Sequence, residues 1–347
     1  MDPFERNQVG TTGLSITRLG FGGGTLGDPV ETLDESQAWD TMATAYNGGI
    51  RHFDTAPWYG LTKSEHRLGR FLGTRPRDSY TVSTKIGRIM FAPDDPAAFQ
   101  DSRWLQRWKG GLPFDLRFDY TRDGVMRSYE DSLQRLGINR VDALAIHDLD
   151  SRHRLDEAGV AAGMKELDEG GGYAALLELK NAGLVKAIGA GINIAGMVPR
   201  FIENFDLDFF LIASPYTLLD QNALDEELSM CAAHGASVII GGVFSSGILA
   251  TGTVPGALYA YQPAPAEILE KTRRIEAVCA RHDVPLPAAA LQFPFGHPSV
   301  VSVIPGANSR PIVESNIEAM QLSIPAEFWA ELKQEGLLRE DAPTPAL

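Results

Sequence analysis

Cysteine is scarce in this sequence. Only Cys231 and Cys279 occur among its 347 residues. So few thiols in so long a chain exclude a disulfide framework and are typical of a protein from a reducing compartment. Both cysteines lie in helical patterns, and we expect them to pack there as small apolar side chains.

Long apolar runs and an excess of positive charge are also missing. No stretch is long and apolar enough to span a bilayer, and the first residues show no signal-peptide pattern. Lysine and arginine number 31 against 45 aspartates and glutamates, which gives a net charge of −14. Negative charge opposes binding to nucleic acid and to anionic membranes. We therefore expect a cytoplasmic protein with a small-molecule substrate, present as a monomer or a weak homo-oligomer.

Two common signatures of functional sites are absent as well. Residues 20–24 are rich in glycine, but their spacing is not the GxGxxG of a dinucleotide-binding Rossmann sheet. No His-x-His or Glu-x-x-His cluster stands at the end of a predicted strand. We therefore expect no metal site, and a metal-dependent hydrolase is disfavoured.

What the sequence does contain is a regular alternation of short apolar strands and helical patterns. The predicted strands are 19–22, 51–54, 80–85, 143–147, 187–191, 209–214, 237–241 and 300–304. Eight alternating units favour a closed parallel (β/α)₈ barrel. Length alone would allow two domains, but one barrel of about 250 residues with insertions also accounts for it. We expect a single domain over residues 1–347.

Helices are predicted between the strands, and several segments depart from the alternation. The helical patterns are 34–48, 64–72, 122–136, 172–182, 220–234, 265–282 and 310–320, with Asp34 as an N-cap and Gly137 as a stop. Residues 7–18 predict an N-terminal hairpin, and residues 336–347 a frayed tail. The long aromatic segment 89–119 predicts either a loop over the active site or a self-packed surface excursion. Segment 153–172 gives little indication of its structure.

Three predicted strands end in a polar side chain that faces the barrel interior. Alternation with period two places Asp54, Lys85 and His147 on the inner face, at the carboxyl ends of their strands. Active sites of (β/α)₈ barrels lie at that end. Each residue alone could be a turn cap, a surface lysine or a packed histidine; together they predict a catalytic site.

The sequence motif around Asp54 resembles that of a known family. Residues 48–60 read Gly-Gly-Ile-Arg-His-Phe-Asp-Thr-Ala-Pro-Trp-Tyr-Gly. Asp54, Tyr59, Lys85 and His147 follow the order of the catalytic tetrad of the aldo-keto reductases, and the chain resembles this family from residue 7 to residue 335. Residues 127–150 are most similar to the group of D-threo-aldose 1-dehydrogenase, L-fucose dehydrogenase and pyridoxal 4-dehydrogenase. The resemblance implies a (β/α)₈ barrel in which residues 7–18 plug the barrel bottom.

The resemblance implies a role for each member of the tetrad. Tyr59 would exchange a proton with the substrate oxygen, although an unperturbed tyrosine has a pKa of about 10. The ammonium of Lys85 would lower that pKa toward working pH, and Asp54 would keep Lys85 charged and oriented. His147 would place the substrate oxygen by a hydrogen bond.

The resemblance also implies a nicotinamide cofactor. Asn193 would hold the nicotinamide carboxamide and the Tyr216 ring would stack on the nicotinamide. Residues 243–249 resemble a loop that covers the pyrophosphate, and residues 304–316 a segment that grips the adenosine. The residues assigned to the cofactor are Gly22, Asn193, Ser214, Tyr216, Val243, Phe244, Ser245, Gly247, Leu249, Ile304, Gly306, Ala307, Arg310 and Asn316.

The identity of the cofactor depends on its 2′-phosphate. Relatives that prefer NADP commonly carry lysine and serine where Gly306 and Ala307 stand, and arginine where Ile312 stands. A phosphate needs cationic partners, and only Arg310 remains nearby. We therefore expect NAD, with NADP possible if Arg310 reaches the phosphate.

The predicted activity is hydride transfer between this cofactor and a small hydroxyl or carbonyl substrate. We expect oxidation of an aldose or of pyridoxal to a lactone, in a pocket with Trp58 as one wall, Trp104 or Phe91 opposite it, and Asp148 nearby. The alternatives are an NADPH-dependent general aldehyde or ketone reductase and a non-catalytic regulatory barrel that binds the cofactor without turnover.

Overall fold

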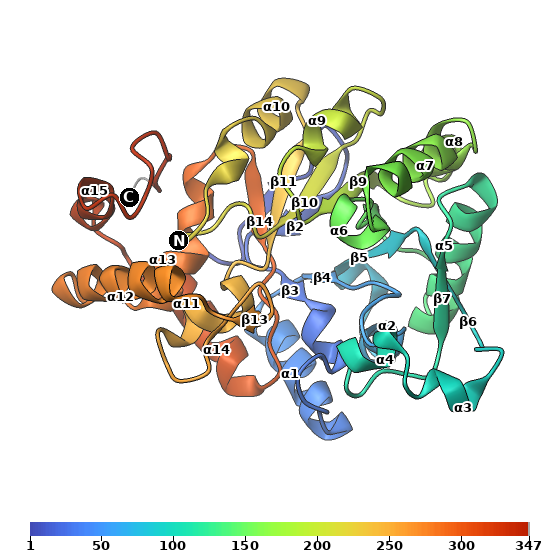
Figure 1. Ribbon diagram of the computed structural model, residues 1–347, viewed down its shortest axis with the longest axis horizontal. Coiled ribbons are helices and arrows are strands. Elements are labelled where there is room, and N and C mark those ends of the chain that lie inside the picture. The colour runs from blue at the N-terminus through green and yellow to red at the C-terminus, as the bar shows by residue number, and fades with distance from the viewer. Residues whose placement is uncertain (346–347) are drawn as a thin grey trace.

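The computed structural model describes residues 1–345, and its centre is an eight-stranded sheet (Figure 1). The strands are β3 (Phe21–Gly22), β4 (His52–Asp54), β5 (Thr81–Ile86), β8 (Ala143–His147), β9 (Ala187–Ile192), β10 (Phe209–Ala213), β11 (Ser237–Gly241) and β14 (Val300–Val303). Neighbouring strands pair in parallel. Parallel bridges from Leu19 to Val303 and from Gly22 to Gly306 join β3 back to β14. The sheet therefore closes into the predicted (β/α)₈ barrel.

Side chains alternate across these strands as expected. In β8, the small Ala143 and Ala145 pack in the barrel interior, whereas Leu144 and Ile146 pack outward in the main core. His147 follows on the inner side at the carboxyl end of the strand. The inward-facing side chains of β8 are thus small inside the barrel and polar at its carboxyl end. This arrangement is suited to a site at the barrel mouth.

Most predicted helices are present. They are α1 (Glu35–Gly48), α2 (Lys63–Leu72), α5 (Arg122–Leu136), α8 (Gly172–Asn181), α10 (Glu227–His234), α12 (Ala266–Arg281) and α14 (Arg310–Gln321). Asp34 caps α1 by accepting from the Ser36 N–H at 2.7 Å, and Gly137 ends α5 in a left-handed conformation. The pattern 220–234 is divided into a 3₁₀ turn (Asn222–Leu224) and the shorter α10.

Several helices were not predicted. Segment 153–172 contains the second half of α6 (Ser151–Arg154) and all of α7 (Glu157–Asp168). Further along lie α9 (Met197–Ile202), α11 (Ile248–Thr251), α13 (Leu286–Gln292) and α15 (Ala326–Gln334). In α7 only Val160, Gly163 and Leu167 are buried, so the apolar stripe is too narrow to stand out in the sequence. Within residues 1–345, no helix combines the length and the apolar character needed to cross a membrane.

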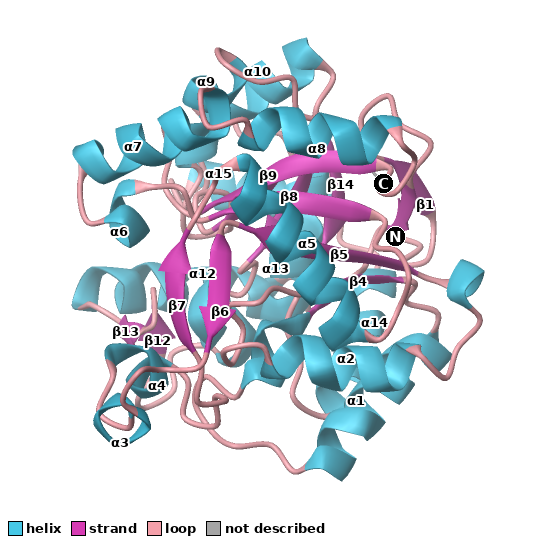
Figure 2. Ribbon diagram, turned by 90° about the vertical axis from the view of Figure 1, so that its right-hand side faces the viewer, coloured by secondary structure: helices cyan, strands magenta, loops and turns pink. Residues whose placement is uncertain are grey.

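The N-terminal hairpin closes the bottom of the barrel. It consists of β1 (Arg6–Gln8) and β2 (Ser15–Thr17), which pair antiparallel. Val9, Leu14 and Ile16 pack against the interior residues Phe209 and Leu211. Figure 2 shows β1 at one end of the barrel strands. Toward the other end lie β6 (Arg88–Phe91), β7 (Asp115–Phe118), β12 (Leu258–Tyr259) and β13 (Gln262–Pro263).

The segment predicted as a long loop at 89–119 is in fact folded. Its stem is an antiparallel hairpin of β6 (Arg88–Phe91) and β7 (Asp115–Phe118), and its tip carries α3 (Pro96–Phe99) and α4 (Arg103–Arg107). Lys63 Nζ donates to the Gly110 carbonyl at 2.8 Å, which holds this β6–β7 excursion against the turn after β4.

The tail is another difference from the sequence prediction. Residues 346–347 lie outside the described residues, but Leu337, Leu338 and Ala342 are buried in the main core. Arg339 pairs with Asp225 at 2.5 Å, so this segment is docked rather than frayed. The prediction failed because a short apolar run near a terminus does not reveal its partner.

Candidate active site

Asp54, Lys85 and His147 lie at the carboxyl ends of β4, β5 and β8. Lys85 Nζ lies 2.6 Å from Asp54 Oδ2 and donates to the Thr55 carbonyl at 2.8 Å, while Ser83 Oγ donates to Asp54 Oδ1 at 2.8 Å. The side chains of Lys85 and Asp54 are only 1% and 3% exposed. Burying an unpaired charge costs free energy, so the ion pair with Asp54 is what allows Lys85 to stay charged at the barrel mouth.

Tyr59 enters the same group from the turn after β4. Lys85 Nζ lies 4.8 Å from the centroid of the Tyr59 ring, and the His147 ring lies 5.7 Å from it at an interplanar angle of 88°. The structure therefore brings together the four residues that the sequence singled out. The phenol stands partly exposed at the mouth, above the buried ion pair.

The charge state of Tyr59 differs from the expectation. Burial raises the pKa of Tyr59 well above its ordinary value, and the negative charges of Asp54 and Asp148 raise it further. The sequence predicted a lowering by Lys85, but burial and these two carboxylates shift the pKa of Tyr59 in the opposite direction, and Lys85 itself is paired with Asp54 at 2.6 Å. Tyr59 is accordingly a neutral phenol, suited to donating a proton.

His147 is held as a neutral imidazole. Burial lowers its pKa well below the ordinary value and outweighs the opposite effect of Asp148. Its backbone carbonyl accepts a hydrogen bond from the Tyr120 hydroxyl at 2.8 Å, and its Nε2 lies 3.4 Å from Asp148 Oδ2. A neutral histidine fixed in this way can donate or accept one hydrogen bond at a substrate oxygen without adding charge.

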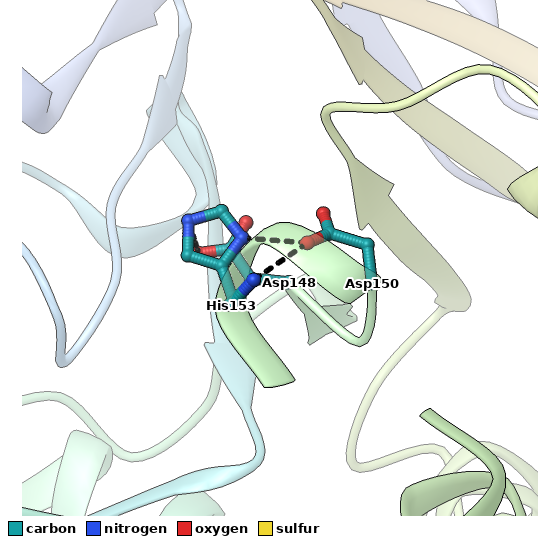
Figure 3. A group of neighbouring side chains, drawn as sticks. All are labelled: Asp148, Asp150 and His153. Atoms are coloured by element: carbon teal, nitrogen blue, oxygen red, sulfur yellow. Dashed lines mark hydrogen bonds and ion pairs between the residues drawn. The ribbon is translucent and has the colours of Figure 1, made fainter. Parts of the chain in front are cut away.

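Asp148 is the centre of a polar network beside His147. It accepts from Arg88 Nη2 at 2.9 Å and from Asn193 Nδ2 at 2.6 Å. Figure 3 shows Asp148, Asp150 and His153 together; their ligand atoms lie within 4.8 Å of one another, an arrangement that could hold a metal ion. Because Arg88 and Asn193 already satisfy Asp148, and His153 Nδ1 bonds Asp150 at 2.8 Å, we assign no metal to this group.

The predicted cofactor segments are neighbours at the other side of the mouth. The loop after β11 has left-handed backbone at Ser245, Ser246 and Gly247, with φ of 47°, 65° and 108°. Beside it, residues after β14 lead to α14, whose N-cap Ser309 makes no side-chain hydrogen bond to the first turn. Free N–H groups at a helix N-terminus and in such a turn are donors for phosphate oxygens.

Two comparisons of sequence and one of structure connect this geometry to known proteins. Residues 18–335 match the model of the aldo/keto reductase family. The chain is 39% identical to pyridoxal 4-dehydrogenase of Microbacterium luteolum over 96% of this chain and 98% of that protein. It is 38% identical to D-threo-aldose 1-dehydrogenase of a Pseudomonas species, over 96% and 97%. This chain belongs to the aldo-keto reductase family.

Among solved structures, the fold is similar to the holo form of an aldo-keto reductase from Bacillus halodurans. The TM-score is 0.74 at 22% identity, with 95% of this chain and 96% of that chain covered. A glycerol dehydrogenase from Gluconobacter oxydans gives a TM-score of 0.69 at 19% identity, covering 100% and 98%. At these identities the structural likeness supports the barrel fold alone.

As an aldo-keto reductase, the protein uses a nicotinamide cofactor. A Cβ added at Gly191 would be in ordinary van der Waals contact with His147 Cδ2, 3.8 Å away, and with Lys85 Cε, 3.9 Å away, so Gly191 lies directly beside the tetrad. A bound nicotinamide would accept or supply a hydride. Asn193, which is predicted to hold its carboxamide, donates from Nδ2 to Asp148 at 2.6 Å and to Asp150 at 3.3 Å, and its contact with the cofactor stays a prediction.

The other predicted cofactor residues divide by exposure. Ser214 is exposed with φ of 98°, and Phe244, Ser245, Gly247 and Arg310 lie in the segments described above. Buried members of the set are Gly22, Val243, Ser245, Leu249, Ile304, Ala307 and Asn316. Gly22 and Gly306 bridge β3 to β14. All of these cofactor assignments remain predictions.

The prediction for Tyr216 needs correction. Its side chain is fully buried and packs against Phe293, with ring centroids 5.2 Å apart. A ring with no exposed face cannot stack on a nicotinamide at the mouth. The sequence suggested otherwise because Tyr216 follows a strand end closely, but the chain turns outward after Ser214.

Three tryptophans cluster next to Tyr59. Trp58 contacts Trp104 and Trp108 edge-on, with centroids 5.5 and 5.4 Å apart, and the assignment of Trp58 and Trp104 to opposite walls of a substrate pocket stays a prediction. Phe91 does not join them. Alternation along β6 places Met90 with this aromatic group and Phe91 on the opposite side of the hairpin.

Sequence reasoning missed several residues around the site. Ser83 could have been found, because it lies two residues before Lys85 on the same strand face. Tyr120, Trp108 and Arg88 come from the β6–β7 excursion and its exit, where no periodic pattern was recognised. Only the folded hairpin brings them to the tetrad.

Proposed function

We propose that this aldo-keto reductase oxidises a hydroxyl-bearing carbon of a small polyhydroxylated or pyridoxal-like substrate. With an aldopyranose the carbon is the anomeric one, and with pyridoxal it is the hemiacetal carbon, so the product is a lactone in both cases. The observation that carries the proposal is Tyr59, set between His147 and the Asp54–Lys85 ion pair. The two relatives of about 39% and 38% identity are named for such substrates.

The roles follow from the geometry. His147 holds the substrate oxygen, and Tyr59 exchanges the hydroxyl proton. In oxidation the phenolate form of Tyr59 would take the proton of the substrate hydroxyl, and a bound nicotinamide would take the hydride from the carbon that bears this hydroxyl. In reduction the phenol of Tyr59 would return the proton to the substrate oxygen. Lys85 Nζ, held by Asp54, lies 4.8 Å from the centroid of the Tyr59 ring, where a positive charge favours negative charge on the tyrosine oxygen.

For the cofactor we propose NAD. Gly306 and Ala307 offer no cation to a 2′-phosphate, and Arg310 Nε is paired with Glu314 at 2.8 Å. The carboxylate of Glu314 offsets the positive charge that a 2′-phosphate would need, which favours the cofactor without that group. A strong NADP preference that is lost in Arg310→Ala would contradict this proposal.

The first experiment is an absorbance assay at the reduced-nicotinamide band, with NAD and NADP in parallel. L-fucose, D-arabinose, L-galactose, pyridoxal and pyridoxine serve as substrates, and a generic aldehyde tests the reverse direction. Growth of signal with NAD and a sugar or pyridoxal supports the proposal and identifies the substrate class. No signal with these, together with NADPH consumption by the aldehyde, contradicts it.

A general NADPH-dependent reductase is the second candidate, and one observation favours it. The raised pKa of Tyr59 makes it a proton donor, which is the role required in reduction. The same assay separates the two candidates.

We also propose a cytoplasmic location, because Cys231 and Cys279 are both free and buried.

A further inference from the structure

A buried arginine stands beside the tetrad without a complete set of partners. Arg88 is the first residue of β6, and its side chain is 3% exposed. Its guanidinium lies 5.0 Å from the ring centroids of both Trp58 and Phe118. Among residues 1–345, the only carboxylate it contacts is Asp148, through Nη2. The Nη1 group is buried and has no hydrogen-bond partner.

A buried cationic donor without a hydrogen-bond partner costs free energy. The free Nη1 of Arg88 therefore indicates a role in binding a ligand. Buried polar groups are nearly always hydrogen-bonded, and those on charged groups most of all. Trp58, one of the two rings beside Arg88, adjoins Tyr59 in the chain, and Asp148, its ion-pair partner, adjoins His147. Arg88 therefore belongs to the substrate side of the mouth.

The position of Arg88 also excludes a cofactor phosphate as the missing partner. In the barrel order, β5 leads into Arg88 and lies next to β4 and β8, whereas the phosphate-binding segments follow β11 and β14. A phosphate held there would be on another side of the mouth. The remaining candidate is an oxygen of the reacting molecule.

We propose that Arg88 is a specificity-determining residue that donates from Nη1 to a substrate oxygen one or two carbons from the reacting carbon. In an aldopyranose this is the C2 hydroxyl, and in pyridoxal it is the 3-oxygen. The guanidinium of Arg88 is planar and is held in place by Asp148 at Nη2 and by the Trp58 and Phe118 rings. It is therefore pre-organised to donate from Nη1. The inference rests on the proposed function, since it assigns the substrate class that the site accepts.

The test compares substrates and variants in one cycle. Each sugar that turns over is measured against its 2-deoxy counterpart, and pyridoxal against 3-deoxypyridoxal, with wild type, Arg88→Gln, and Arg88→Gln/Asp148→Asn. The double variant avoids leaving Asp148 as an unpaired charge. In wild type, loss of the oxygen should lower kcat/KM about 10- to 100-fold. In both variants the parent and deoxy compounds should react equally.

Arg117→Gln is the matched control, because Arg117 is an exposed arginine on β7 of the same hairpin. It should keep the wild-type ratio between parent and deoxy substrates. NAD binding, followed by tryptophan fluorescence, should be equal in wild type and Arg88→Gln. An unchanged substrate ratio in both Arg88 variants, or no discrimination in wild type, would overturn the inference.

Equilibrium binding separates this inference from the proposed function. If none of the compounds turns over, their binding to the NAD complex is measured by fluorescence of the pocket tryptophans. Tighter binding of the parent compound that depends on Arg88 would support the inference even though the proposed reaction fails. Equal binding of parent and deoxy compounds would overturn it.

Discussion

Tyr59 is the residue on which the chemistry depends most directly. Its hydroxyl is the only group of the tetrad suited to exchanging a proton with the substrate, since Lys85 is tied to Asp54 and Thr55. Tyr59→Phe should lower kcat/KM at least 100-fold, within the range of about 10²–10⁴ for general acid–base catalysis. Steady-state kinetics measure the loss. Cofactor affinity in a fluorescence titration should stay unchanged, and near-normal turnover would contradict the assignment.

The same residue predicts how the reaction responds to pH. Because the pKa of Tyr59 is raised, its phenolate is a minor form at neutral pH. Oxidation needs that form as a base, so its rate should rise with pH from 7 to 10, approaching about tenfold per unit. Reduction uses the phenol and should stay level over the same range. A plateau of the oxidation rate below pH 8 would show that the pKa is not raised in the working enzyme.

His52 affects stability rather than chemistry. It is buried on the inner face below Asp54, with Nδ1 3.1 Å from Thr81 Oγ1 and Nε2 unpaired. Burial lowers its pKa from 6.5 to about 4, so the unfolded chain binds a proton that the folded chain does not. Its effect is absent above pH 6.5 and grows as pH falls toward 4. Urea unfolding at pH 7 and pH 5 should show a contribution of about 2 kcal/mol to the loss of stability.

His52→Gln is the variant that tests this cause. It removes the titrating group while keeping a polar side chain of similar length, so stability should decline less steeply between pH 6.5 and 4. His147 contributes in the same direction and remains in the variant. Parallel pH curves for wild type and His52→Gln would contradict the role given to His52.

At the scale of elements, the β6–β7 excursion depends on a glycine. Gly87 has φ of 105°, and a Cβ there would lie 2.1 Å from Tyr120 Cε1. Gly87 turns the chain from β5 into β6 and so places Arg88, while Tyr120 supports the His147 carbonyl. Gly87→Ala should therefore destabilise the fold by about 1–3 kcal/mol and lower activity as well. Denaturant unfolding and the oxidation assay measure both effects.

Gly13→Ala serves as the comparison for that change. A Cβ at Gly13 meets no atom within 4 Å, so the substitution should leave stability and activity near wild type. Equal behaviour of the two variants would mean that the turn after β5 adapts without strain. The aromatic excursion would then be less rigidly coupled to the tetrad than its contacts indicate.

At the scale of the whole molecule, the C-terminal segment completes the core. Leu337 and Leu338 are 1% and 3% exposed and belong to the main core. A chain ending at Gly336 should lose about 3 kcal/mol or more of stability, given about 1.5–3 kcal/mol for each buried leucine. Thermal and urea unfolding test this. A chain ending at Thr344 keeps these contacts and should match wild type, and equal loss in both would contradict the role of the leucines.

The sequence by itself determined the barrel and the tetrad. Eight strands of alternating character, with Asp54, Lys85 and His147 at their carboxyl ends, follow from a local period of two and from the family resemblance around Tyr59. Local rules suffice there because parallel strands carry their inner residues to a common edge. Ser83 obeyed the same rule and could have been included.

Only the tertiary structure decided the fold of residues 88–118, the burial of Tyr216 and the docking of the tail. These three features depend on contacts between segments that are distant in the sequence. Whether a side chain is buried depends on the residues that cover it as well as on its own segment. The tertiary structure also decided that the pKa of Tyr59 is raised rather than lowered. The pKa of that group depends on burial and on whether Asp54 neutralises Lys85, and both are set by distances of a few ångströms between residues far apart in the chain.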